Sequence, residues 1–171
     1  MGMHASIVMT VLAADRPGLV AALSETIAAH GGSWQESRMA RLAGQFAGIV
    51  RVECPALQAD ALVASLIGLE SHGISIQAKR EESAAAPVRE TLSLDVMGND
   101  RPGIIRALSA AIAGAGANVE DLSTSLESAP MAGHPIFRAQ GLVSLAPEGD
   151  PAALIAAIEK LGPDLSVSIE R

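Results

Sequence analysis

The second half of the chain alternates between strand-like and helix-like patterns of apolar residues. Residues 165–170 alternate strictly between polar and apolar, as expected of a strand with one buried face. Apolar residues recur at helical spacing from Ile104, and Asp150 followed by Pro151 predicts the start of a second helix. The elements expected here are a strand over 91–96, a turn over 98–103, a helix from 104 to 114, strands over 118–127 and 138–145, a helix from 151 and a strand over 165–170.

The first half shows the same order of elements. We expect a strand over 7–12, a helix over 19–29, strands over 33–42 and 46–53 joined at Gly44, a helix over 57–71 and a strand over 74–79. The order βαββαβ therefore occurs twice. It predicts an α+β fold of two ferredoxin-like units, each an antiparallel sheet covered by helices on one face.

An internal repeat supports this division. Asp-Arg-Pro-Gly occurs at residues 15–18 and again at 100–103, an offset of 85 residues, and 10 of 17 positions are identical between 15–31 and 100–116. The composition around residues 81–87 is that of a linker. We therefore predict a first domain over 1–81, a linker over 82–89 and a second domain over 90–171. Units this small are marginal alone, so each is expected to pack on the other or on another chain.

Composition and charge exclude several classes of function. The net charge of −7 disfavours an electrostatic grip on nucleic acid or anionic lipid. Aromatic residues make up only 2% of the chain, which leaves little material for stacking on bases. No apolar stretch approaches the ~20 residues that span a bilayer, and no signal peptide is evident. A lone cysteine, Cys54, favours a reducing compartment, so a cytoplasmic protein is expected.

Metal binding and catalysis find no support in the sequence. The histidines lack metal-ligand spacing, and Cys54 is expected to be a buried thiol. No nucleophile with a neighbouring base is evident, so we expect no catalytic residues, no metal and no cofactor. Glu36, Arg38 and Arg41 on a predicted strand form either a solvated face or a patch that contacts a partner.

The repeated Asp-Arg-Pro-Gly turns have two interpretations. A helix N-terminus carries free N–H groups and a partial positive charge, so it suits a carboxylate. Asp15 and Asp100 can accept hydrogen bonds from an ammonium group, and Gly18 and Gly103 allow close approach. Together these groups suit a zwitterionic amino acid. In the alternative interpretation, the aspartates simply cap the helices.

Longer motifs carry a family resemblance. The turn after the first strand, followed by a helix ending before Gly116-Ala117-Asn118, resembles the ACT domain, and Gly31-Gly32-Ser33 is the counterpart in the first half. The runs 34–48, 127–131 and 135–138 resemble the glycine cleavage system transcriptional repressor family, with the resemblance covering essentially the whole chain.

The resemblance implies ligand binding at interfaces between two ACT units. It places the ligand loops on 13–18 and 98–103, with partner positions at the second strand of each unit. The ligand-binding residues it implies are Asp15, Gly18, Ser33, Asn99, Asp100, Gly103 and Asn118. Because serine is shorter than asparagine, the Asp100/Asn118 site is favoured over the Asp15/Ser33 site.

The resemblance also implies a non-enzymatic function. The chain is expected to sense a small amino acid such as glycine or serine, and to regulate transcription through a protein partner, an activator, without binding DNA directly. A homo-oligomer is expected. The alternative is a constitutive protein–protein interaction module with no functional ligand site.

Overall fold

A computed structural model describes residues 3–81, 89–128, 131 and 133–171. The chain forms two compact units, residues 1–85 and 86–171. The predicted linker, 82–89, falls almost entirely outside the described residues, so its bounds stay a prediction.

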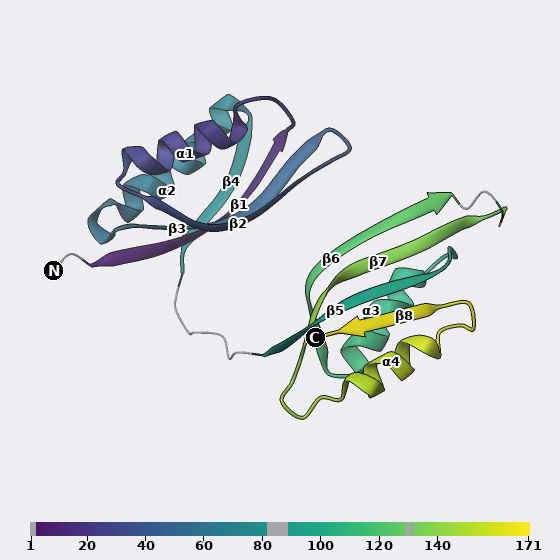
Figure 1. Cartoon of the computed structure of the whole chain (residues 1–171). Helices are drawn as coiled ribbons and strands as arrows, with labels where there is room; N and C mark the ends of the chain where they lie inside the picture. Colours follow the sequence, from purple (N-terminus) through teal and green to yellow (C-terminus); the bar gives the residue numbers. More distant parts are fainter. Residues whose placement is uncertain (1–2, 82–88, 129–130, 132) are drawn as a thin grey trace. The chain divides into compact units, whose positions relative to one another are not determined.

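The first unit is one antiparallel sheet with two helices on one face (Figure 1). Its strands lie in the order β2-β3-β1-β4. The elements are β1 (His4–Ala14), α1 (Leu19–Ala29), β2 (Ser33–Leu42), β3 (Gln45–Pro55), the 3₁₀ turn η1 (Ala56–Gln58), α2 (Ala59–Ile67), the 3₁₀ turn η2 (Gly68–His72) and β4 (Ile74–Arg80).

The second unit repeats this arrangement, with its strands in the order β6-β7-β5-β8. The elements are β5 (Glu90–Asn99), α3 (Ile104–Gly114), β6 (Ala117–Ser128), β7 (Pro135–Leu145), α4 (Pro151–Glu159) and β8 (Ser166–Glu170). The predicted α+β fold of two ferredoxin-like βαββαβ units is confirmed.

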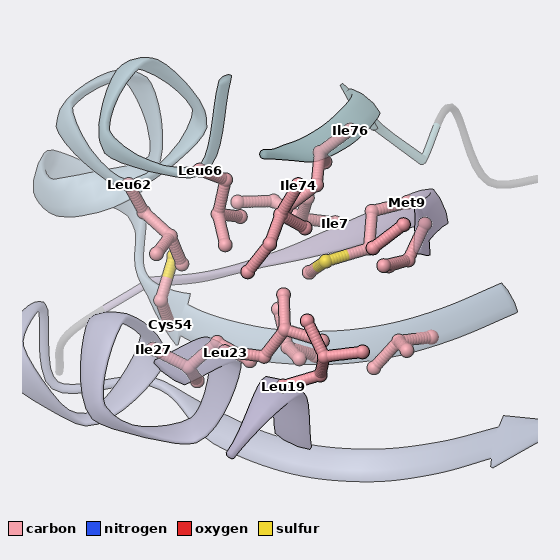
Figure 2. Packing of buried hydrophobic residues seen from close by; sticks show 14 of the residues in the cluster. Ile7, Met9, Leu19, Leu23, Ile27, Cys54, Leu62, Leu66, Ile74 and Ile76 are labelled. Atoms are coloured by element: carbon pink, nitrogen blue, oxygen red, sulfur yellow. The ribbon is translucent and has the colours of Figure 1, made fainter. Parts of the chain in front are cut away.

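Each unit has its own apolar core between the sheet and its helices. In the first unit, Leu19, Leu23 and Ile27 of α1 face the sheet at three- and four-residue spacing (Figure 2). Ile7 and Met9 of β1 lie opposite, since alternate strand residues point to one face. The opposite face of each sheet has no helix over it among the described elements.

Cys54 belongs to this first core, as the sequence predicted. Its side chain is buried, and burial raises the pKa of the thiol. The neutral thiol therefore behaves as a small apolar side chain.

Several predicted boundaries were wrong. The helix expected over 57–71 is an α-helix only over 59–67, with 3₁₀ turns on both sides. The turn expected from Gly98 begins later, because β5 continues through Asn99. Asp150 does cap α4 as predicted, since its side chain accepts a hydrogen bond from the Ala152 N–H.

A β-bulge occurs at the same place in both units. The register of β2 against β3 shifts between Trp34 and Glu36, and that of β6 against β7 shifts between Val119 and Asp121. The two shifts lie 85 residues apart, so the repeat extends from the turn through the second strand. Positions on β2 and β6 can therefore be compared residue by residue.

Candidate functional site

The two Asp-Arg-Pro-Gly turns join β1 to α1 and β5 to α3. Gly18 and Gly103 are the residues immediately before the helices, with φ of +89° and +79°. This left-handed conformation disfavours other residues, which explains the glycine. Space beside both glycines is open, because no atom lies within 4 Å of the position that a Cβ would take.

The capping interpretation of the aspartates is wrong. Neither helix has a side-chain hydrogen bond at its N-cap, because that position is held by glycine. Asp15 and Asp100 precede the N-cap by three residues. The two carboxylates are therefore not used in holding the helix ends.

The arginine of each turn fastens it to the connection that precedes the last strand. Arg16 donates to the carbonyl of His72, before β4. Arg101 donates to the carbonyl of Leu161 at 2.7 Å and pairs with Asp164 at 3.3 Å, before β8. These arginines have a structural function, because their side chains are directed at the fold and hold the turns in place.

Asp164 gives the second turn further support. Its carboxylate accepts a hydrogen bond from the backbone N–H of Asn99 at 2.9 Å. This bond, with a smaller contribution from Arg101, lowers the pKa of Asp164. Asn99 therefore holds the turn through its backbone.

A groove of about 420 Å³ opens beside the second turn. Asp100 and Gly103 line it, together with the first residues of α3 and the outer strand β6. Its other lining residues are Ile104, Ile105, Arg106, Thr124, Ser125, Leu126 and Phe137. The volume falls in the range of small-molecule pockets. The groove has a carboxylate and a helix N-terminus at one end and apolar side chains along its wall.

Asp15 of the first unit has a partner. Its carboxylate lies 3.3 Å from a guanidinium nitrogen of Arg41 on β2. Asp100 makes no such side-chain contact with any residue in the described ranges. Of the charged β2 residues, Glu36 instead pairs with Arg51 at 2.9 Å.

Ser33 and Asn118 lie far from the turns of their own units. Asn118 stands opposite Ser144, which stands opposite Thr91, eight residues before Asn99 on β5. At ~3.3 Å per residue this is about 26 Å. Ser33 is likewise aligned through Glu53 with Ser6, at the far end of β1 from Asp15. The predicted partner residues do not join their own turn.

Local contacts engage both of these side chains. The Asn118 amide donates to Glu120 at 3.0 Å, and the Ser33 hydroxyl accepts from Gln35 at 3.1 Å. Both residues are exposed, so a second protein surface can reach them.

A second hollow, of about 410 Å³, lies on the uncovered sheet face of the second unit. Asp95 sits in it and is held by Arg138 at 2.8 Å and by Gln140 at 3.2 Å. Hydrogen bonding to Arg138 lowers the pKa of the Asp95 carboxyl and raises that of Arg138. Because Asp95 is already paired, this hollow is a weaker candidate for a ligand site than the groove at Asp100.

Neither a metal site nor a membrane-spanning helix is found in the described ranges. No three His, Cys, Asp or Glu side chains there are grouped so that they could bind a metal ion. No helix among those residues has the length and apolar character needed to cross a membrane.

Comparison with protein families finds a match in each unit. The model of the ACT domain matches residues 5–79 and 90–132. The chain belongs to the ACT domain family. It is a tandem ACT protein, since one match falls in each unit.

Two solved structures resemble the whole tandem. An unknown protein from Galdieria sulphuraria is 30% identical, with 98% of both chains covered and a TM-score of 0.80. A protein described as a candidate glycine cleavage system transcriptional repressor is 16% identical and matches over 98% of this chain and 97% of its own, with a TM-score of 0.71. The second likeness shows that the fold is shared. Among curated proteins, none matches.

Several residues of the groove beside Asp100 were missed in the sequence analysis. Leu126 and Phe137 line it, yet in the sequence each is only one apolar strand residue among many. For Leu126 the sequence does contain a signal. The offset of 85 residues aligns Leu126 with Arg41, which contacts the turn of the first unit. Asp164 lies 65 residues from Asn99 in the chain, and no local pattern connects the two.

Proposed function

We propose that this tandem ACT protein is an amino-acid-responsive regulator that acts through a protein partner. The supporting observation is the groove beside Asp100, where a carboxylate with no partner among the described residues lies at the start of a helix. The regulated process is proposed to be transcription of genes of glycine or amino-acid metabolism, in the cytoplasm and without catalysis.

Each end of a zwitterionic amino acid has a counterpart in this groove. The Asp100 carboxylate accepts hydrogen bonds from the ammonium group. The N–H of Ile104 already donates to the Arg101 carbonyl at 3.3 Å. The next N–H groups of α3, those of Ile105 and Arg106, have no partners within the helix, and the positive end of the helix dipole favours the α-carboxylate. In this arrangement the side chain of the amino acid lies against Ile105 and Leu126, which line the groove.

The apolar wall bears on the choice of ligand. Ile105 is 40% exposed and Leu126 is 60% exposed, so both have apolar surface that a ligand can cover. Glycine has no side chain to cover it, whereas a larger apolar side chain gains about 25 cal/mol per Å² buried. Leucine therefore belongs in the ligand panel beside glycine and serine.

A second ACT unit is proposed to complete the site. Asn118 lies about 26 Å along the strands from the turn of its own unit, so it can act only on a ligand held by another unit. This requirement is met in a homo-oligomer, where a second copy of the chain supplies the other unit. A protein partner is proposed to recognise the surface that changes when the ligand is bound.

Calorimetric titration with glycine, L-serine and L-leucine, each to millimolar concentration, tests the proposal. Binding of at least one is expected, weakened at least tenfold in Asp100→Asn and also weakened in Asn118→Ala. Glu25→Gln is the matched control, because this exposed acid lies on α1 of the first unit and lines no groove described above.

Other outcomes would contradict the proposal. Absence of heat with all three amino acids would refute ligand sensing and favour a constitutive interaction module. Equal loss of affinity in Asp100→Asn and Glu25→Gln would show that binding depends on the net charge of the protein and not on the groove. A partner whose binding is the same with and without amino acid would refute regulation by the ligand.

A further inference from the structure

One difference between the two ACT units lies at a strand position that touches the turn. On β2, Arg41 stands opposite Phe46, which stands opposite Ala13. On β6, Leu126 stands opposite Phe137, which stands opposite Gly98. The two phenylalanines are the only ones in the chain, and they hold equivalent positions. Arg41 and Leu126 are therefore structural counterparts.

This difference decides whether the aspartate of each turn has an ion-pair partner. In the first unit, the Arg41 guanidinium lies 3.3 Å from the Asp15 carboxylate. In the second unit, the counterpart is an apolar side chain that lines the groove. Arg106 of α3 lines the same groove, but it makes no ion pair with Asp100. Asp100 accordingly has no side-chain hydrogen bond or ion pair with any residue in the described parts of the chain.

We infer that the Arg41 guanidinium fills the position beside Asp15 that a ligand ammonium group needs, so that only the second turn accepts the ammonium group of an amino acid. The inference rests on the proposed function and specifies its stoichiometry: one amino acid per chain. Arg41 is a residue that determines which of the two sites binds.

The physical basis is competition for one carboxylate. A ligand ammonium at Asp15 must replace Arg41 and also remain close to its positive charge. Two like charges about 4 Å apart repel enough to lower affinity by about fivefold in bulk water, and by several hundredfold at a partly shielded protein surface. The ion pair itself adds little, because Arg41 is 71% exposed and surface pairs are weak. We expect the first site to bind more than tenfold more weakly than the second.

Exchange of the two counterparts tests this directly. Calorimetry with glycine, L-serine and L-leucine should give one site per chain in the wild type. Arg41→Leu should open the first turn and give two sites per chain, and Leu126→Arg should reduce the wild-type site to less than a tenth of its affinity. The double exchange should bind one amino acid per chain at the first turn, so that Asp15→Asn removes binding there and Asp100→Asn does not.

Arg41→Lys is the control for charge. It keeps a cation beside Asp15, so the stoichiometry should remain one. Arg41 and Leu126 are both exposed, and circular dichroism of each variant should show that its fold is unchanged.

The inference and the proposed function fail in different ways. Two sites of similar affinity in the wild type, or a single site in Arg41→Leu, would overturn the assignment to Arg41 while leaving amino-acid sensing intact. If neither the wild type nor Arg41→Leu binds any of the three amino acids, the proposed function fails as well.

Discussion

Replacement of Gly18 by alanine measures how much the left-handed backbone conformation of the turn contributes to the free energy of unfolding. Gly18 has φ of +89°, and no atom lies within 4 Å of the position that a Cβ would take. Any loss of stability must therefore come from the left-handed conformation and not from a clash. The same change at a helical glycine should have the opposite sign, because alanine is the better helix residue.

The magnitude follows from two opposing contributions. The left-handed conformation costs an L-residue about 1–2 kcal/mol. Alanine also restricts the unfolded chain, which stabilises the folded state by about 0.4–1 kcal/mol. Gly18→Ala should therefore destabilise the first unit by about 1 kcal/mol, which lowers Tm by roughly 4–8 °C for a domain of this size.

Urea unfolding followed by tryptophan fluorescence isolates the first unit. Trp34 is the only tryptophan in the chain, and it packs against the first core. Gly68→Ala is the matched control, because Gly68 has φ of −60° with open space around it. The free energy of unfolding of the first unit should rise by about 0.4–1 kcal/mol in this variant. Shifts of the same sign in the two variants would refute the reasoning, as would a loss of about 3 kcal/mol or more in Gly18→Ala.

Three further changes test the second unit. Gly141→Ala should prevent folding of this unit, seen as loss of half the circular dichroism signal, because its Cβ would overlap the Asp121 carbonyl oxygen. Leu108→Ala should lower the free energy of unfolding by about 2–5 kcal/mol in calorimetry, since the side chain is buried in the core. The lowered pKa of Asp164 means that its contribution to stability is present above about pH 4 and is lost as pH falls through the folded-state pKa. Asp164→Asn should therefore reduce the acid sensitivity of the unfolding midpoint of this unit, and an unchanged sensitivity would contradict the role of the Asn99 hydrogen bond.

The fold was predictable because two independent periodicities agree. Alternation marks the strands, helical spacing marks the helices, and the 85-residue repeat excludes most other arrangements. The errors lie where backbone conformation outweighs side-chain pattern. The helix expected over 57–71 breaks into 3₁₀ turns at both ends, and the N-cap of α1 is a left-handed glycine and not Asp15.

The candidate site was predictable only in part. Asp100 and Gly103 do line one groove, as their shared turn suggested. The far wall of the groove comes from β6, and only the three-dimensional register brings Leu126 to it. Asn118 was expected to act with Asp100 at an interface between two units, and strand geometry places the two residues at opposite ends of one unit. Whether the seven residues implied by the resemblance bind a ligand stays a prediction.

The duplicated bulge bears on the ancestry of the chain. An irregularity at the same residue of β2 and β6 indicates that the ancestral unit already carried it before the gene doubled. The left-handed glycine and the tethering arginine of each turn are common to both copies and share that origin. Arg41 and Leu126 differ, so this contrast arose after duplication, when the two copies of the unit became free to diverge from each other.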